Sequence, residues 1–251
     1  YKRFGDSGNV DLVWEETGTG TKDDPIMIYD IQGLQSMASG DGSTYYQLGA
    51  DLDLSRWSHS AVSGTIHLDG DNHSISNLAI RASYGGYEVT GLFKSLNNST
   101  VKNLTLQDVS VTGSMAQAVG ILAGEVTGDV TLENVSVVNS SIDISDSYKD
   151  GESYYVGGLV GRVADGASLT LVGCRVESTV KLPESATGTY TVCVGGFVGY
   201  GAISDSGTGN TNSTGLPDTG GETPSTATAG GEVQSAVQAG MMLCPLRLRQ
   251  Q

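Results

Sequence analysis

The chain has 251 residues, with 13 lysine and arginine residues against 28 aspartate and glutamate residues, and a formal net charge of −15 at pH 7. A chain without a basic patch cannot gain affinity by releasing counterions from phosphate groups, so this charge disfavours nucleic acid and anionic membranes as partners. The 36 glycines and the aromatic content of 6% suit short strands joined by many turns.

We expect residues 1–20 to be an N-terminal extension and residues 21–204 to form one repetitive β domain. Short runs of the form apolar–polar–apolar recur along this domain, and a period of two is the signature of strands. Glycine, asparagine, aspartate and serine stand between the runs, where the chain must turn. No stretch before Ser225 has a persuasive helical pattern. Because the chain starts at Tyr1 rather than Met, we expect its natural N-terminus to lie further upstream.

The repeat is marked by glycines and by paired apolar residues. The doublet Val130/Leu132 recurs 39 positions later as Leu169/Leu171. Internal repeats at such periods are typical of stacked architectures. The marker glycines, separated by 29, 38 and 38 residues, are Gly91, Gly120, Gly158 and Gly196.

A unit of about three short strands cannot bury its own apolar face, but a stack of such units can. We therefore predict an all-β fold, a parallel β-helix filled by valine, leucine and isoleucine. Asn77, Asn103 and Asn134 occupy equivalent places before their strands. Two interpretations stay open: the asparagines form a hydrogen-bonded ladder, or they tolerate a corner conformation that other residues avoid.

The repeat resembles a known family. GGLVG at 157–161, followed by a short loop and an Asn-apolar-x-apolar run, is similar to the GLUG motif of bacterial surface proteins. The stretch GTGTKDDPIMIYDIQGLQSMAS at 18–39 resembles the opening of these domains, where a lead-in precedes a short strand and a short helix. YYQLGADLDLS and GTIHLDGDNHSISNLAI resemble the first coils.

The likeness covers residues 18–204. It implies a right-handed parallel β-helix in a secreted or wall-attached protein, often as a stalk or adhesive segment. Some relatives carry a zinc peptidase domain that cleaves immunoglobulin A, and nothing in this sequence matches that domain.

From residue 205 the composition changes to glycine, serine, threonine and proline, which predicts a disordered linker and tail over residues 205–251. Inside it, one pentapeptide resembles the sortase recognition signal of Gram-positive bacteria. The resemblance implies cleavage after the threonine, which would then be linked to peptidoglycan, with no membrane segment in the mature form. The pentapeptide consists of Leu216, Pro217, Asp218, Thr219 and Gly220.

The sequence after this pentapeptide fits a sorting signal poorly. The apolar run at 233–246 is interrupted and too short to span a bilayer, although Arg247 and Arg249 follow it. The alternative interpretation is a chance pentapeptide in a linker rich in threonine and glycine.

The histidines do not predict a metal site. His59, His67 and His73 form no HExxH motif, which excludes a zinc peptidase of that type from this chain. His67 and His73 flank LDGDN, yet with Asp69 or Asp71 they match no ligand spacing, so turn residues are the favoured interpretation.

Paired carboxylates could do acid–base work on a polysaccharide, but lysine and arginine do not cluster with them along the sequence. We expect them to form a solvated outer face, and we predict no catalytic residue, cofactor or metal. The pairs are Asp51 with Asp53, Asp69 with Asp71, and Asp143 with Asp146.

The cysteine count argues against a disulfide framework, because it is odd. Cys174 replaces a valine in its doublet, which favours a buried free thiol. The alternative is a bridge to Cys193, which needs stacked coils in contact. The third cysteine is Cys244.

Together these features predict a non-catalytic segment of an extracellular, cell-wall-attached bacterial protein. It would act as an adhesin or stalk, with a host glycan or protein as its partner. The first alternative is a β-helical polysaccharide lyase or hydrolase. The second is a stalk fragment of a larger surface peptidase. Outward tyrosines such as Tyr154 and Tyr155 either bind such partners or, as we favour, cover the coil edge.

Overall fold

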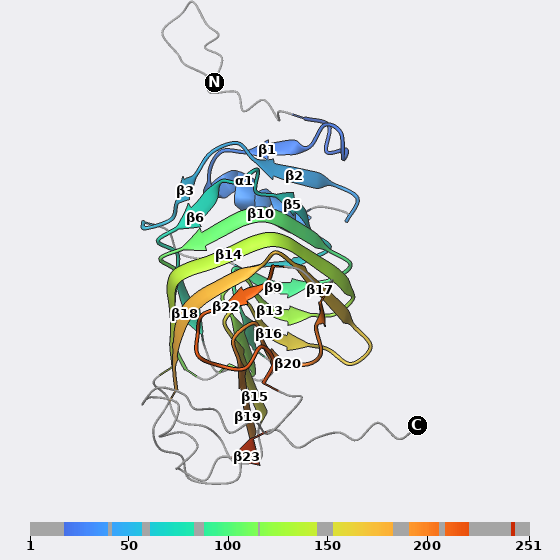
Figure 1. The fold of residues 1–251 in the computed structure, drawn as a ribbon. Coiled ribbons are helices and arrows are strands. Elements are labelled where there is room, and N and C mark those ends of the chain that lie inside the picture. The colour runs from blue at the N-terminus through green and yellow to red at the C-terminus, as the bar shows by residue number, and fades with distance from the viewer. Residues whose placement is uncertain are drawn as a thin grey trace, which may run out of the picture.

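The architecture is all-β with parallel sheets. The computed structural model describes residues 18–39, 42–56, 61–82, 88–114, 116–144, 153–182, 191–205, 209–220 and 242–243. Their strands form three sheets, of thirteen, five and five strands. Every pairing between named strands is parallel. Figure 1 shows the strands of successive units lying one below the other.

The first sheet is the largest, and its order begins β1-β2-β5-β10-β14, after which β14 pairs with both β17 and β18. Its strands are β1 (Ile26–Ile28), β2 (Tyr45–Leu48), β3 (Leu52–Asp53), β5 (His67–Asp69), β6 (Ser74–Ser76), β7 (Ala79–Ala82), β10 (Thr100–Gln107), β11 (Ser110–Gly113), β14 (Asp129–Ile144), β17 (Ser168–Val172), β18 (Arg175–Lys181), β21 (Ser204–Asp205) and β22 (Thr211–Asn212).

The other two sheets run in the orders β8-β12-β15-β19-β23 and β4-β9-β13-β16-β20. The second sheet holds β8 (Val89–Thr90), β12 (Ala118–Gly120), β15 (Ser153–Gly157), β19 (Thr191–Gly195) and β23 (Met242–Leu243). The third holds β4 (Val62–Gly64), β9 (Phe93–Leu96), β13 (Ala123–Val126), β16 (Val160–Val163) and β20 (Val198–Tyr200).

The predicted doublets are stacked as the sequence repeat requires. In the β14–β17 ladder, Val130 pairs with Leu169 and Leu132 with Leu171. One column of inward side chains runs through four strands: Leu68 pairs with Val101, and Val101 with Leu132. All six of these side chains are buried, and each contributes on the order of 1.5–3 kcal/mol of transfer free energy.

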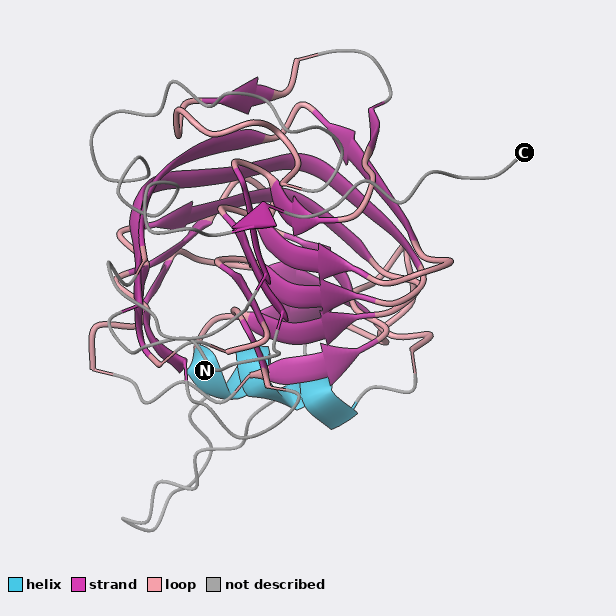
Figure 2. Cartoon of the chain, turned by 90° about the horizontal axis from the view of Figure 1, so that it is seen from below, coloured by secondary structure: helices cyan, strands magenta, loops and turns pink. Residues whose placement is uncertain are grey.

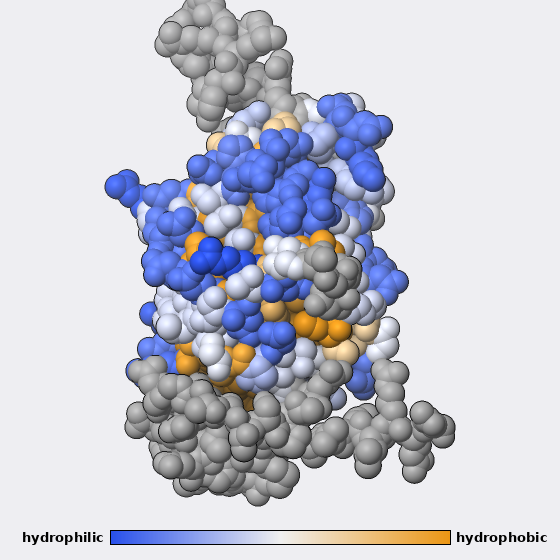
Figure 3. Space-filling model, in the orientation of Figure 1, coloured by the Kyte–Doolittle hydropathy of each residue, from blue (hydrophilic) through white to orange (hydrophobic). Residues whose placement is uncertain are grey.

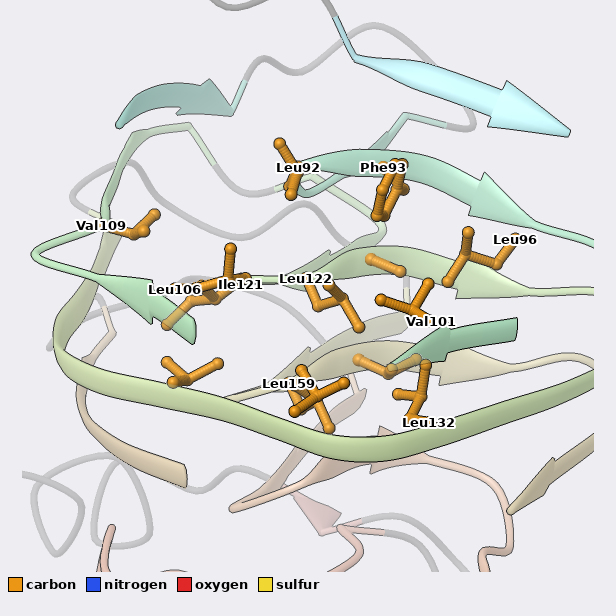
Figure 4. Close-up of a cluster of buried hydrophobic side chains, with 14 of the residues drawn as sticks. Leu92, Phe93, Leu96, Val101, Leu106, Val109, Ile121, Leu122, Leu132 and Leu159 are labelled. Carbon is orange, nitrogen blue, oxygen red and sulfur yellow. The ribbon is translucent and has the colours of Figure 1, made fainter. Parts of the chain in front are cut away.

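The core is lined by all three sheets, and the second sheet contributes Val119, Val156 and Val192. Figure 4 shows Leu92, Phe93 and Leu96 on the same side of the strands as Leu122 and Leu159. All of these side chains are buried and belong to one cluster that extends from Ile28 to Leu216. The described chain therefore shares one continuous apolar interior, to which each unit contributes a layer.

The glycines of the repeat lie where backbone crosses backbone. A Cβ on Gly161 would stand 2.6 Å from the carbonyl oxygen of Gly124 and 2.6 Å from the amide nitrogen of Val119. A Cβ on Gly199 would stand 2.4 Å from the nitrogen of Val156. No side chain fits at such distances. We call these positions the glycine seam: Gly120, Gly124, Gly157, Gly161, Gly195 and Gly199.

The register aligns the marker glycines one residue earlier than the sequence repeat suggests. Gly120 pairs with Gly157, and Gly157 pairs with Gly195. The second glycine of each GG pair, Gly158 or Gly196, therefore lies at the turn after the strand. The hydrogen-bond register between strands, rather than the alignment of similar sequence motifs, decides which glycines are stacked.

The corner interpretation is confirmed for all three asparagines, and the ladder is confirmed for Asn103 and Asn134. Asn77 is not at the equivalent place that the sequence suggested: it lies at another corner and donates to Oδ1 of Asp53 at 3.1 Å. Asn77, Asn103 and Asn134 have φ values of 57°, 51° and 52°, in the left-handed region that asparagine tolerates. Asn134 also donates from Nδ2 to Oδ1 of Asn103 at 3.1 Å, and Asn103 donates to Oδ1 of Asp69 at 3.0 Å. The corners are therefore stacked and linked by side chains.

A short helix stands near the start of the stack, as the family resemblance implies, although the residue pattern before Ser225 did not indicate one. The helix α1 (Ile31–Ser36) is followed by a 3-10 turn, η1 (Met37–Ser39). Asp30 caps it, accepting a 3.0 Å hydrogen bond from the amide of Gly33. Leu34 and Met37 are buried, and Figure 2 shows the helix beside the stacked strands.

Candidate functional site

The sortase-like pentapeptide, residues 216–220, lies along the edge of the third sheet. Thr219 forms a parallel bridge with Val198 of β20. The amide of Gly196 donates to the carbonyl of Pro217 at 2.6 Å, and the amide of Gly220 donates to the carbonyl of Val198 at 2.9 Å. Leu216, 9% exposed, joins the core cluster. The backbone of this segment is therefore paired on one side.

The pentapeptide takes the place that a further glycine-marked strand would occupy. The carbonyl of Phe197 accepts from the amide of Val160, and the amide of Val198 donates in turn to the carbonyl of Asp218 at 3.0 Å. A Cβ on Gly220 would stand 2.3 Å from the oxygen of Gly199 and 2.5 Å from the nitrogen of Val194. Gly220 thus extends the glycine seam by one position.

Asn212 at the end of β22 holds the segment from the other side. Its Nδ2 donates to the carbonyl of Leu216 at 2.8 Å and to Oδ1 of Asp218 at 2.9 Å. Its Oδ1 accepts from the amide of Thr214 at 3.0 Å. A Cβ on Gly196 would stand 2.0 Å from Nδ2 of Asn212, so the absence of a side chain there makes room for this asparagine.

The sequence predicts a linker from residue 205, and the structure places residues 209–220 against the domain. The segment buries few apolar side chains. Backbone hydrogen bonds to the edge of the third sheet hold it, and amino-acid composition does not predict such bonds. Sequence reasoning did not identify Asn212 as holding the segment, nor Asn210, whose Oδ1 accepts from the amide of Cys174 at 2.8 Å and whose Nδ2 donates to the carbonyl of Leu171 at 3.2 Å. The apolar run at 233–246, apart from β23, lies outside the described residues, as do Arg247 and Arg249.

A second feature is a cavity of about 250 Å³ near the start of the stack. The ring of Tyr29, 55% exposed, lies beside it and against Gly49. The amide of Ser74 and then the ring of His73 lower the pKa of Asp51. The cavity is lined by Tyr29, Asp30, Ile31, Asp51, Leu52, Asp53, Leu54 and Arg56.

The predicted pairs of acids do face outward, but basic residues accompany two of them. Lys102 lies 2.8 Å from Asp69, and Lys181 lies 3.6 Å from Asp143. Burial raises the pKa of Asp69, but hydrogen bonds from Lys102, from the amide of Asp71 and from Asn103 outweigh it, so the pKa lies below its usual value. Asp146 lies outside the described residues.

The histidines have structural partners. His67 stacks on Tyr45 with 4.7 Å between ring centroids, and Nδ1 of His73 lies 3.2 Å from Asp51. His59 lies outside the described residues. Within the ranges that the structure describes, no three histidine, cysteine, aspartate or glutamate side chains come together as a metal site would require.

Cys174 and Cys193 are buried and no disulfide joins them, so the buried-thiol interpretation of Cys174 is confirmed and the bridge is not formed. Sγ of Cys174 donates to the carbonyl of Leu132 at 3.3 Å. Burial raises the pKa of the Cys174 thiol. Such a group is a packing element rather than a nucleophile.

The tyrosines before the glycine repeat divide between inside and outside. Tyr154 is buried in the core. Tyr155 lies beside Tyr200, with centroids 4.9 Å apart, and under the guanidinium of Arg162. Arg162 in turn pairs with Glu125. These contacts cover the strands, which fits the interpretation that we favoured.

One face of the molecule is mostly polar. Figure 3 shows hydrophilic residues over much of this face, with apolar residues in separate small patches. Along the described part of the chain, no helix combines the length and the apolar content that crossing a membrane would take.

These sheets define a class of protein made of stacked parallel strands, and comparisons with known proteins give two relatives. No family model matches the chain. It is 34% identical over 175 residues to halomucin from Haloquadratum walsbyi, a match over 64% of this chain and 2% of halomucin. It is 27% identical over 201 residues to immunoglobulin A1 protease from Streptococcus sanguinis, over 67% of this chain and 10% of that protein.

Among solved structures, the chain is similar to the crystal structure of an immunoglobulin A1 protease-like protein from Bacteroides ovatus. The identity is 23%, the TM-score is 0.43, and the match covers 74% of this chain and 64% of that chain. The chain spans a small part of the length of the two curated relatives, so its likeness is to segments of much longer proteins.

Proposed function

We propose that this chain is a non-catalytic segment of a larger extracellular surface protein, where it acts as a stalk or adhesive spacer. The observation that carries the proposal is the combination of a stack of similar units with a match to 2% and 10% of two long proteins. A stack of units suits a spacer because each unit contacts its neighbours only, so length is gained by adding units.

We further propose that the three sheets are the walls of a right-handed parallel β-helix with GLUG-like repeats. The support is the strand order from β8 to β22, in which each successive unit gives one strand to the second sheet, one to the third, and one or two to the first. The glycine seam supports the same proposal, since it places Gly157 and Gly161, the first and last glycines of GGLVG, where two walls approach each other.

We propose wall attachment through the pentapeptide at 216–220, with peptidoglycan as the covalent partner. The test is to express the chain behind a secretion signal in a Gram-positive host, with and without its sortase. The expected result is protein that stays in walls boiled in detergent only when sortase is present. Thr219→Ala is the control, because it removes the residue to be linked. Equal release into the medium from both hosts would end the attachment proposal.

A second candidate, favoured by the 27% identity to immunoglobulin A1 protease, is the stalk of a larger surface peptidase. The chain would then have the same physical role, with activity in another part of the protein. The sequence upstream of Tyr1 distinguishes the two: a peptidase domain in the same reading frame supports the second candidate.

The remaining alternative is a polysaccharide lyase or hydrolase. Our proposal of a non-catalytic role is supported by the engagement of Asp69, whose carboxylate accepts from Lys102, Asn103 and the amide of Asp71. A screen on acidic and neutral polysaccharides checks it. If the chain turned over a polysaccharide and Asp69→Ala or Asp71→Ala abolished that turnover, the proposal of a non-catalytic stalk would be wrong and the enzyme alternative would stand.

A further inference from the structure

The bond that a sortase would cut is part of the folded edge. The nitrogen of the Thr219–Gly220 bond is hydrogen-bonded to Val198, and Gly220 fits into the glycine seam with no room for a Cβ. The carbonyls of Pro217 and Asp218 accept from the amides of Gly196 and of Phe197 and Val198. One side of the pentapeptide is therefore occupied by the protein itself.

A transpeptidase must take this pentapeptide into its own cleft as an accessible extended strand. Backbone groups bonded to the edge at Gly196 and Val198 are not available to another protein, and the side chain of Leu216 is inside the core. Binding to the edge and binding to an enzyme are thus mutually exclusive, and the reaction draws only on the undocked fraction.

We propose that the edge formed by residues 195–198, together with Asn212, is a self-peptide site that controls access to Thr219–Gly220. The inference rests on the proposed wall attachment and assigns its regulation: the docked form is protected and the undocked form is the substrate. Attachment then occurs before the edge forms during export, or after a change that releases residues 211–220.

The controlled step is a group transfer. The amide between Thr219 and Gly220 breaks, and the Thr219 carbonyl passes through a thioester of the transpeptidase to an acceptor amine. The new amide takes the place of the old one. Gly220 leaves as a free amine and gains the proton that the acceptor amine loses, so no oxidant or reductant is needed.

Two substitutions outside the pentapeptide would release it without changing the recognition sequence. Asn212→Ala removes the donor to Leu216 and Asp218. Gly196→Ala places a methyl group at 2.0 Å from the present position of Nδ2 of Asn212 and forces that side chain away. Ser213→Ala is the matched control, because Ser213 is exposed and its amide hydrogen bond to Val176 survives the change.

The experiment compares cleavage by a purified class A sortase, with triglycine as acceptor, of the full chain and of a synthetic peptide with residues 213–223. We expect the peptide to react at least about tenfold faster than the full chain, as a docked population of about 90% or more requires. Asn212→Ala and Gly196→Ala should bring the full chain close to the peptide, while Ser213→Ala should not. Equal rates for peptide and unaltered chain would overturn the inference.

Hydrogen exchange gives a readout that needs no sortase. The amides of Gly196, Phe197, Val198 and Gly220 should be protected in the unaltered chain and in Ser213→Ala, and should lose protection in Asn212→Ala. If sortase leaves the peptide intact, the wall-attachment proposal fails while this protection still supports the self-peptide site. Exchange at random-coil rates in the unaltered chain would overturn the self-peptide site whatever the sortase does.

Discussion

Replacing Gly161 by alanine is the most direct test of the packing that explains the repeat. The new Cβ would lie 2.6 Å from the Gly124 oxygen and 2.6 Å from the Val119 nitrogen, and 3.0 Å from the carbonyl carbon of Ala118. All three obstacles are backbone atoms of neighbouring strands, so no side chain can rotate away. The two sheets must separate locally or the strand must shift.

The size of the effect follows from these distances. Overpacking a core costs about 1–3 kcal/mol through off-rotamer side chains and backbone shifts. Here the backbone must move, so we expect a loss of about 3 kcal/mol in the free energy of unfolding, at the top of that range. With a urea dependence of about 2 kcal/mol per molar, the midpoint of unfolding should fall by about 1.5 M.

Urea unfolding followed by circular dichroism measures the shift. Gly166→Ala is the control: nothing lies within 4 Å of its Cβ position, and its φ of +82° carries only the strain of a left-handed alanine, about 1–2 kcal/mol. If Gly161→Ala were no more destabilising than Gly166→Ala, the close approach of the sheets would not be the reason for the glycine repeat.

Other predictions concern faces, charge and thiols. Leu171→Asp should cost several kcal/mol, roughly, because it buries an unpaired charge, while Thr170→Asp should barely change the urea midpoint; equal effects would contradict the assigned faces. The pKa of Asp69 is lowered and that of Lys102 is raised, so their pairing should stabilise the fold above the unfolded pKa of Asp, about 3.9, and below that of Lys, about 10.4. This stability should be lost as pH falls through the lowered pKa or rises through the raised one. In Lys102→Met the urea midpoint should lose its alkaline limb and keep a smaller acid limb, because the amide of Asp71 and Asn103 still donate to Asp69. Cys174 should resist a thiol reagent in the native chain and react in urea, as peptide mapping would detect; rapid native labelling would contradict its burial.

Much of the fold could be predicted from the sequence because the repeat and the strand period express the same constraint. Inward residues such as Val130 and Leu169 recur at the interval that hydrogen-bond register imposes. The corner role of Asn103 and Asn134 was also readable, since few residues adopt a positive φ. Periodicity does not tell which of the two alternating sets of side chains on a strand faces the interior. For this reason we expected Tyr154 to lie outside, whereas it is buried in the core.

Only one part of the candidate site, the pentapeptide itself, could be predicted from the sequence. The pentapeptide can be recognised in the sequence. Its docking depends on the backbone amides of Gly196 and Phe197, and a backbone amide is present whatever the side chain, so the sequence does not single out these two. The spacing from Gly199 to Gly220 is shorter than the 38 residues between Gly161 and Gly199. The repeat therefore did not predict a further position of the glycine seam at Gly220. The edge of a sheet binds a strand through the positions of its backbone groups, and amino-acid composition does not predict this binding.

The length of the units varies most at one junction. Between the first and second sheets, β11 ends at Gly113 and β12 starts at Ala118, whereas in the next unit β14 ends at Ile144 and β15 starts at Ser153. The stacked registers on either side are unaffected by this difference. Foreign peptides grafted at this junction, such as epitope tags, should therefore be displayed without disturbing the layers above and below.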